Sequence, residues 1–206
     1  LAIHLDRQAN DGHKINSQKE LRPILLQARN EEKFRLDELL LNLVCKQYEN
    51  ETVEQVLSHE LLLYDTQPAQ LVGLEQQFIA SARLDNLLSC YLGCKALMTS
   101  GSKHASVLVC NDHEEVGSVS TSGAQGPFLR SVLQRLIRGF HQEEDAFQRV
   151  ARQSIFLSVD NAHGVHPNFS EKHDDQHYAL LNGGPVIKIN ANQRYASNSQ
   201  SIALFK

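Results

Sequence analysis

Positive charge, long apolar runs and paired cysteines are all scarce in this sequence. Lysine and arginine number 20 against 24 aspartate and glutamate residues, so the formal net charge is -4. A mildly acidic chain lacks the electrostatic footprint of a nucleic-acid-binding protein. No apolar run approaches the roughly 18 residues that indicate a membrane span. We therefore expect neither nucleic acid nor a membrane as a partner.

The first ten residues, LAIHLDRQAN, lack the charged segment and the cleavage site of a signal peptide. None of the four cysteines belongs to a C-x-x-C pair, and we expect reduced, buried thiols in a cytoplasmic protein. The composition is ordinary for a globular protein, with 41% hydrophobic and 21% charged residues, and 206 residues suffice for a real core. The apolar start and the helical end, SQSIALFK, lead us to expect a fragment of a longer protein.

Helical and apolar segments alternate in the second part of the chain. A continuous apolar run indicates a strand buried on both faces, and apolar residues spaced three and four apart indicate a helix. Alternation from about residue 72 predicts an α/β layer structure, which the preceding residues do not follow. We therefore expect one domain over 1–70 and another over 71–206. The expected strands are 1–6, 60–65, 78–81, 106–110, 154–159 and 184–190, and the expected helices are 33–47, 52–60, 83–98, 128–140, 143–153 and 199–206.

Carboxylates follow the predicted strands directly. Residues 112–115 and Asp160 each come after an apolar strand, and Asp85 opens the helix after residues 78–81. Side chains just past the carboxyl ends of strands in an α/β sheet gather in one crevice, where ligands bind. Carboxylates that meet repel one another unless a proton or a cation compensates them, and zinc accepts such ligands. The sequence thus predicts a metal site, with Asp85 as a plain helix cap left as the alternative.

The pair Glu114 and Glu115 suggests a division of labour. In extended backbone, successive side chains point to opposite sides, so one glutamate can bind a metal while the other faces a water held by that metal. A metallohydrolase needs this arrangement, because the metal lowers the pKa of the water and a free carboxylate removes its proton. The alternative is a solvated loop with no catalytic role.

Seven segments of the chain, in order, resemble the signature segments of the aspartyl aminopeptidases. The most specific of them are N-D-H-E-E-V-G-S and S-V-D-N-A-H-G-V-H-P-N. The resemblance covers essentially the whole chain and is carried by A-I-H-L at 2–5, Y-D-T-Q-P-A at 64–69, R-L-D-N at 83–86, N-D-H-E-E-V-G-S at 111–118, S-V-D-N-A-H-G-V-H-P-N at 158–168, G-P-V-I-K-I-N at 184–190 and Q-R-Y-A-S-N at 193–198.

The resemblance implies a zinc aminopeptidase that removes Asp or Glu from the N-termini of peptides, with two zinc ions in each active site. Asp85 would bridge the two ions, Glu115 would complete one and Asp160 the other, and Glu114 would be the general base. Each zinc also takes a histidine in that family, one from an H-T-D-type segment upstream and one near the C-terminus. Neither segment occurs in this sequence, and none of its ten histidines stands in a matching context.

The resemblance also implies a fold and an assembly. The fold would be a phosphorylase/hydrolase-like α/β domain, with a mixed sheet between helices and an inserted β-rich dimerisation domain. Residues 1–70 would be the end of the insert, and residues 71–206 would be the central part of the catalytic domain. The implied self-association is a dimer that builds a twelve-subunit shell.

The resemblance also implies roles in substrate binding for five further residues. Lys188 and Tyr195 would hold the acidic side chain of the substrate, because a buried carboxylate requires a cation. His163 and His166 would orient Asp160 or the substrate. His4 would reach the active site of a neighbouring subunit, as a substrate contact or as a metal ligand. From the residues alone, Lys188 is a solvated strand lysine and His4 lies on a strand face.

Two alternatives to this function remain. One is a non-catalytic assembly or zinc-binding piece, inactive alone because it lacks the two metal-ligand histidines. The other is a different two-zinc hydrolase of the same fold, with another specificity.

Overall fold

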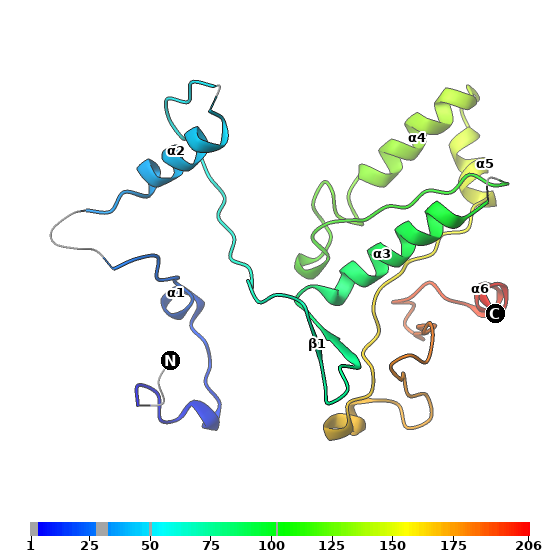
Figure 1. Cartoon of the computed structure of the whole chain (residues 1–206). Coiled ribbons are helices and arrows are strands. Elements are labelled where there is room, and N and C mark those ends of the chain that lie inside the picture. Colours follow the sequence, from blue (N-terminus) through cyan, green and yellow to red (C-terminus); the bar gives the residue numbers. More distant parts are fainter. Residues whose placement is uncertain (1–3, 28–32, 50, 102) are drawn as a thin grey trace. The chain divides into compact units, whose positions relative to one another are not determined.

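A computed structural model describes residues 4–27, 33–49, 51–101 and 103–206 (Figure 1). The chain divides into two compact units, unit 1 over residues 1–64 and unit 2 over residues 65–206. The sequence places its domain boundary near residue 70, in the same connecting stretch. Each unit is considered by itself below.

The described part of unit 1 contains three short helical elements. They are the 3-10 turn η1 (Ala9–Asp11) and the α-helices α1 (Ser17–Glu20) and α2 (Leu36–Gln47). Asn16 caps α1, since its side-chain oxygen accepts a hydrogen bond from the Lys19 amide at 3.2 Å. The helix predicted over 33–47 is confirmed as α2.

Three other elements predicted in this part of the chain are wrong in the described residues. Residues 52–60 form no helix, residues 60–65 form no strand, and residues 4 and 5 lie in a turn, while residues 1–3 lie outside the described part. The prediction of the 52–60 helix rested on Thr52 as its N-cap, but a helix this short needs packing for stability. Leu57 has no such packing, since 85% of it is exposed.

Unit 2 begins with an antiparallel hairpin of β1 (Gln70–Val72) and β2 (Phe78–Ala80). The strand predicted over 78–81 is confirmed as β2, whereas β1 lies outside the strands predicted from the sequence. Gly73 stands in the turn with a φ of 95°, and a Cβ there would meet the Gln77 Oε1 atom at 2.7 Å. Glycine is therefore required at this position.

In the described residues after this hairpin, four helices and two 3-10 segments follow. The helices are α3 (Leu84–Thr99), α4 (Phe128–Phe140), α5 (Ala146–Gln153) and α6 (Ser199–Phe205), and the 3-10 segments are η2 (Glu114–Val116) and η3 (Pro167–Lys172). The four helices confirm the predictions made from apolar spacing. Helices α4 and α5 pack against each other, and the Arg130 guanidinium lies 5.8 Å from the centre of the Phe147 ring.

The strands predicted over 106–110, 154–159 and 184–190 are wrong: in the described residues, β1 and β2 form the only sheet. A continuous apolar run indicates a tendency to be buried, but a strand also needs a partner strand for its backbone groups. Residues 106–110 instead run back along α3 (Figure 1), where the Leu108 side chain lies 2.9 Å from the position that a Cβ would take at Gly93.

The large buried core expected from the composition is also absent from the described part. Among its residues only Gly123 and Ala146 are buried, Ala146 with 4% of its surface exposed, while Phe156 is 71% and Ile189 is 66% exposed. The described chain thus combines helices with a small sheet, and its apolar segments keep most of their surface accessible. The cysteines follow the same trend: none forms a disulfide, and Cys94 and Cys110 are exposed, contrary to the expectation of buried thiols.

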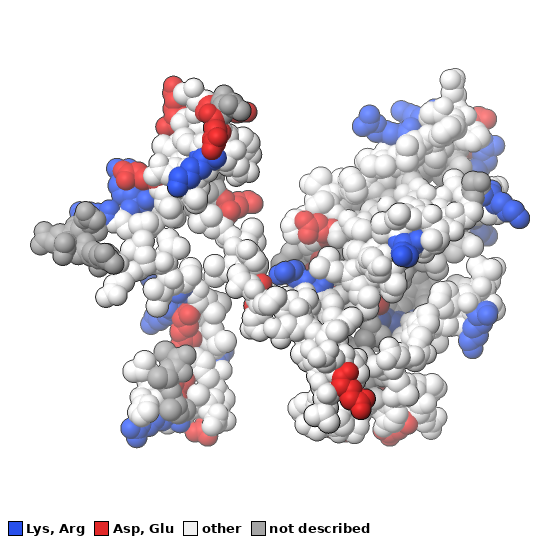
Figure 2. Space-filling model, viewed as in Figure 1, with Lys and Arg blue, Asp and Glu red and all other residues white. Residues whose placement is uncertain are grey.

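Charged side chains of both signs are interspersed over the face that Figure 2 shows. This distribution agrees with the nearly balanced charge of the sequence, 20 basic against 24 acidic residues. In the described part of the chain, no helix combines the length and the apolar character needed to cross a bilayer.

Candidate active site

The start of α3 meets two distant segments of unit 2. The Lys188 ammonium donates hydrogen bonds to the Asp160 Oδ2 atom at 2.6 Å and to the Asn161 carbonyl oxygen at 2.9 Å. Asp85, in the first turn of α3, lies near enough to Asp160 for its side chain to help lower the pKa of the Asp160 carboxyl group. The peptide bond from Asp85 to Asn86 is cis. Two acids and one lysine predicted for the site therefore meet.

Electrostatics in this cluster favour an ionised Asp160. The hydrogen bond from Lys188 is the main cause that holds the pKa of Asp160 below its usual value, partial burial opposes it, and the lysine charge and Asp85 add to it. The Lys188 side chain is only 26% exposed, whereas Asp160 remains 51% exposed. Lys188 is thus not a solvated strand lysine, and the cluster stays open to ligands from one side.

Asp85 does not act as a plain helix cap. The N-cap position of α3 belongs to Arg83, and no side chain caps this end with a hydrogen bond. The backbone of Asp85 and Asn86 departs from helical geometry, so regular helix begins after them. The carboxyl group of Asp85 faces Asp160 instead, which is the arrangement that a metal or proton site requires.

Tyr195 joins the cluster through its ring. The Lys188 ammonium lies 5.9 Å from the centre of the Tyr195 ring, within the range of a cation–π contact. The tyrosine is 44% exposed. The two residues that the resemblance assigns to the substrate carboxylate are therefore neighbours in this structure.

Two asparagines at the site were missed by the sequence analysis. Asn86 and Asn161 each follow one of the aspartates, and each donates or accepts hydrogen bonds across the cluster. The repeated Asp-Asn dipeptide, in R-L-D-N and in S-V-D-N, was a signal that could have identified them.

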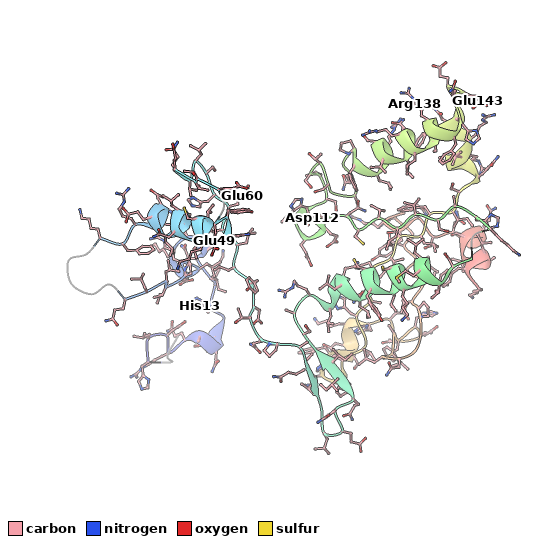
Figure 3. The ribbon with its side chains drawn as sticks, turned by 45° about the horizontal axis from the view of Figure 1, so that its top comes forward. His13, Glu49, Glu60, Asp112, Arg138 and Glu143 are labelled. Atoms are coloured by element: carbon pink, nitrogen blue, oxygen red, sulfur yellow. The ribbon has the colours of Figure 1, made fainter. Side chains whose placement is uncertain are left out.

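Glu114 and Glu115 lie in η2, between α3 and α4, and both are exposed. His113 (φ 60°) and Gly117 (φ 102°) bound this turn with left-handed backbone, and Asp112 precedes it (Figure 3). The premise of extended backbone is therefore wrong. In a 3-10 turn of three residues per turn, successive side chains still diverge, by about 120°. The two glutamates can thus still face different ligands.

Of the three histidines implied for the site, His166 contacts residues other than Asp160. The His166 Nδ1 atom accepts a hydrogen bond from the Asn168 amide at 3.1 Å and caps η3, and the His166 ring lies 5.4 Å from that of Phe169. His163 is exposed in the loop after Asn161, and His4 is exposed in a turn of unit 1. The roles implied for these three histidines remain predictions.

The donor chemistry of the cluster fits a divalent cation. Two carboxyl groups are held together and compensated by an ammonium group, and carboxylate oxygens are ligands that zinc accepts. Glu115 does not join them here. Across residues 4–27, 33–49, 51–101 and 103–206, no three acidic, histidine or cysteine side chains come close enough to hold a metal ion. The structure thus gathers Asp85 and Asp160 of the predicted ligand set.

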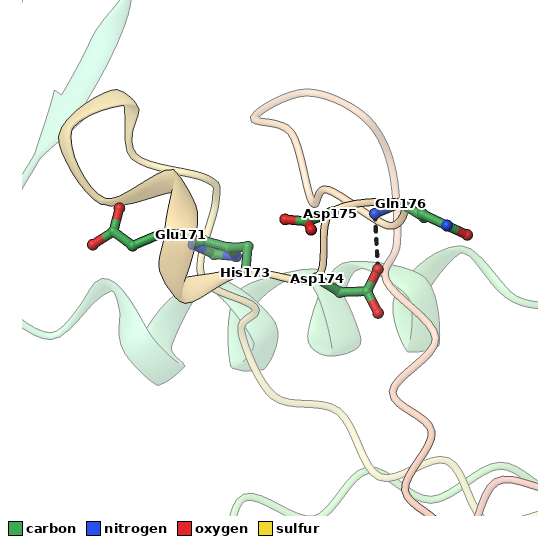
Figure 4. Close-up of a pocket in the computed structure, with 5 residues that line it drawn as sticks. All are labelled: Glu171, His173, Asp174, Asp175 and Gln176. Carbon is green, nitrogen blue, oxygen red and sulfur yellow. Dashed lines mark hydrogen bonds between the residues drawn. The ribbon is translucent and has the colours of Figure 1, made fainter.

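A shallow hollow elsewhere in unit 2 is lined by polar side chains (Figure 4). Its residues are Glu171, His173, Asp174, Asp175 and Gln176. Asp174 accepts a hydrogen bond from the Gln176 amide at 2.8 Å, the main cause that lowers the pKa of its carboxyl group. His177 adds a contact to Asp174 at 3.0 Å. These local bonds describe a surface loop, separate from the cluster around Asp160.

Comparison with protein families connects this geometry to known proteins. A family model described as "Aminopeptidase I zinc metalloprotease (M18)" matches residues 1–206. Two relatives, each called "Probable M18 family aminopeptidase 2", come from Azotobacter vinelandii and Pseudomonas putida. Each is 52% identical over 206 residues, which is 100% of this chain and 47% of the relative. This chain therefore spans about half the length of the curated relatives it matches.

Solved structures give the same result. The structure described as "Crystal structure of prApe1" matches with a TM-score of 0.82 and 25% identity, over 99% of this chain and 46% of that one. The structure of yeast aminopeptidase 1 (Ape1) matches with a TM-score of 0.69 and 28% identity, over 81% of this chain and 40% of that one. The path of the chain is thus similar to part of these larger structures.

Proposed function

This chain belongs to the M18 family of zinc metalloproteases, and on that premise we propose that the complete protein is a zinc aminopeptidase that removes N-terminal Asp or Glu residues from peptides. The observation that carries the proposal is the meeting of Asp85, Asp160 and Lys188 from three distant segments. It combines carboxylates suited to zinc with a cation suited to an acidic substrate.

The metal would be held by Asp85, Asp160 and Glu115, with two ions in each site and further ligands outside these residues. When bound, zinc supplies a Lewis acid that lowers the pKa of water to about 7. Glu114 removes a proton from the attacking water and delivers it to the leaving amine, so that the peptide bond breaks and a free amino acid leaves. Asp85 and Asp160 supply negative charge that retains the cations.

Lys188 supplies the preference for acidic residues. A lysine ammonium has three N–H donors, and the hydrogen bonds to Asp160 and Asn161 use two of them. The third is available to a substrate carboxylate, and the exposed Tyr195 hydroxyl offers a second donor beside it. An acidic side chain bound here exchanges water for charge-assisted hydrogen bonds, whereas a neutral one leaves the ammonium with an unmatched donor.

A second candidate is an aminopeptidase of the same family with another specificity. The observation that favours it is the short contact of 2.6 Å between Lys188 and Asp160, which already neutralises the lysine. In that case Lys188 only pairs with the metal ligand Asp160 and does not bind the substrate. Substrate preference then follows from other residues.

The experiment is a comparison of substrates with the complete, purified protein. Peptides that differ only at the N-terminal residue, with Asp, Glu, Asn or Leu, are assayed before and after removal of zinc by a chelator. We expect Asp and Glu peptides to be cleaved with a kcat/KM about 10-fold or more above that of Asn and Leu peptides, since charge-assisted bonds contribute about 1.5–3 kcal/mol. Cleavage that prefers Leu supports the second candidate. Full activity without any metal contradicts both.

The assembly implied by the resemblance is part of this proposal. Dimers would form through unit 1 and build a larger closed shell, and His4 would contribute to the site of a neighbouring subunit. We place the enzyme in the cytoplasm, as expected for reduced cysteines.

A further inference from the structure

Two Asp-Asn dipeptides interlock at the candidate site. The Asn86 side-chain amide donates to the Val159 carbonyl oxygen at 3.3 Å and to the Asp160 Oδ1 atom at 3.4 Å. The bonds run from the dipeptide that contains Asp85 to the dipeptide that contains Asp160. They connect Asn86, the residue after Asp85, to Asp160 and to the residue before it.

Asn161 makes the reciprocal connection. Its Oδ1 atom accepts a hydrogen bond from the Ser89 hydroxyl at 2.6 Å, and its Nδ2 atom donates to the Leu84 carbonyl oxygen at 3.2 Å. Its own carbonyl oxygen accepts from the Lys188 ammonium at 2.9 Å. One asparagine therefore touches α3 on both sides of Asp85 and also holds the lysine.

The hydrogen bonds of Asn86 and Asn161 connect the segment that contains Asp85 to the segment that contains Asp160. Four bonds join residues 84–89 to residues 159–161, and each has Asn86 or Asn161 as a partner. They span 72 to 77 residues of chain, so the segments are not kept together by their local sequence. Without such bonds, two carboxylates that carry like charge tend to separate.

An amide is suited to this role because it is neutral and has both a donor and an acceptor. The Asn161 amide uses both ends, which fixes the orientation of its plane. Both asparagines are only partly exposed. A carboxylate at either position would add a third negative charge, and an alanine would remove the bonds.

We infer that Asn86 and Asn161 are positioning residues that hold Asp85 and Asp160 at a fixed separation before a metal ion binds. The inference deepens the proposed function and rests on it, since the separation matters to catalysis only if the two acids bind metal. Metal ligands that are fixed in advance lose less conformational freedom on binding, and groups that support ligands typically contribute about 10- to 100-fold to metal affinity.

The test starts with Asn161→Ala in the complete protein. Zinc is removed, and zinc binding to the metal-free protein is measured by calorimetry, with kcat and KM measured separately after reloading. We expect the zinc Kd to rise about 10-fold or more and kcat at limiting zinc to fall, while KM changes little. An unchanged zinc Kd in a folded variant overturns the inference.

Ser89 provides a milder test with a conservative counterpart. Ser89→Ala removes the donor to Asn161 and should weaken zinc binding in the same direction by a smaller factor. Ser89→Thr keeps the hydroxyl and should restore most of the affinity, which a general effect on helix packing would not. Ser100→Ala is the matched control, because this serine lies at the other end of α3 and donates locally to the Leu97 carbonyl oxygen.

A double-mutant cycle separates failure of the inference from failure of the proposed function. Chemical unfolding of the metal-free protein is measured for Ser89→Ala, Asn161→Ala and both together. We expect the two effects on the unfolding equilibrium constant to be coupled by at least about twofold, as for residues in contact. If the two substitutions are coupled but the protein binds no zinc, the hydrogen-bonded role of Asn161 stands and the proposed zinc enzyme is wrong. If the protein has zinc-dependent activity but the substitutions are not coupled, the positioning role of the asparagines is wrong and the proposed function stands.

Discussion

The two units of the chain differ in the range of their side-chain hydrogen bonds. In the described part of unit 1, those involving His13, Asn16, Arg22 and Cys45 join residues no more than 8 positions apart. In unit 2, Asn86, Ser89 and Asn161 bridge 72 to 77 positions. The candidate site therefore depends on contacts of much longer range than these bonds of unit 1.

This difference has a thermodynamic consequence. Closing a loop of some seventy residues costs entropy that grows with the logarithm of loop length, and the cost is recovered only when several contacts form together. The bonds around Asp85 and Asp160 should form cooperatively with the fold of unit 2. Those of unit 1 should form and break locally, with little effect elsewhere.

The largest expected effect is a loss of kcat, and it tests whether η2 belongs to the candidate active site of unit 2. Glu114→Gln should lower kcat about 100- to 10,000-fold, the usual contribution of a general base, while zinc content measured by atomic absorption stays near that of the wild type. Glu115→Gln should also lose zinc, because this residue is expected to be a ligand. Equal loss of zinc in both variants contradicts the division of roles.

A second, smaller effect tests the cation of the cluster. Lys188→Leu should reduce the ratio of kcat/KM for Asp over Leu N-termini by about 10- to 100-fold, since it removes a charge-assisted hydrogen bond. Lys95→Leu, on the exposed surface of α3, serves as the matched control. An unchanged ratio for Lys188→Leu would show that acidic specificity lies elsewhere.

A third variant asks whether unit 1 contributes to the site at all. His4→Ala should lower kcat/KM by about fivefold, the effect of one neutral hydrogen bond, and only in the assembled oligomer. Dilution to dissociated subunits, checked by light scattering, should abolish the difference from the wild type. A loss of zinc in His4→Ala would instead make His4 a ligand.

The smallest effect is a pH response confined to unit 1. A hydrogen bond from the Asn16 amide, and after it the nearby His13, lowers the pKa of Glu20 below its usual 4.5. A carboxyl group with a lowered pKa stabilises the fold above its unfolded pKa, and this stabilisation is lost as the pH falls through the folded pKa. The Asn16 amide signal should therefore shift below pH 4.5.

Glu20→Gln should remove that shift. The bonds among Asn161, Ser89 and Leu84 join neutral groups of unit 2, and Glu20→Gln should leave their amide protection as in the wild type at every pH. A difference at Asn161 between Glu20→Gln and the wild type would show that the two units are coupled.

The helices were the most predictable part of the fold. The apolar spacing in residues 83–98 and 128–140 is local information, and α3 and α4 form where it indicates. The apolar runs 106–110 and 154–159 were misassigned as strands, because pairing depends on partners that the run itself does not specify. The hairpin strand β1 was missed, since Pro68 and Gly73 flank only a short apolar segment, Leu71 and Val72.

The site was predictable where charge was the signal. Of the three acids expected to meet, Asp85 and Asp160 lie together and Glu115 does not, although the strands that suggested their convergence do not form. Lys188 was expected at the site only by resemblance, and it contacts Asp160. Neutral amides give no such signal, so Asn86 and Asn161 became visible only through their hydrogen bonds. The remaining ligand role of Glu115 stays a prediction from the resemblance.

The most direct test of the account is anomalous diffraction at the zinc edge from crystals of the complete protein. The account predicts peaks about 2.0–2.2 Å from carboxylate oxygens of Asp85, Asp160 and Glu115, with Glu114 close by but outside the metal's coordination. Zinc bound elsewhere, or a fully zinc-loaded protein in which Asp85 and Asp160 lie far from every peak, would contradict it.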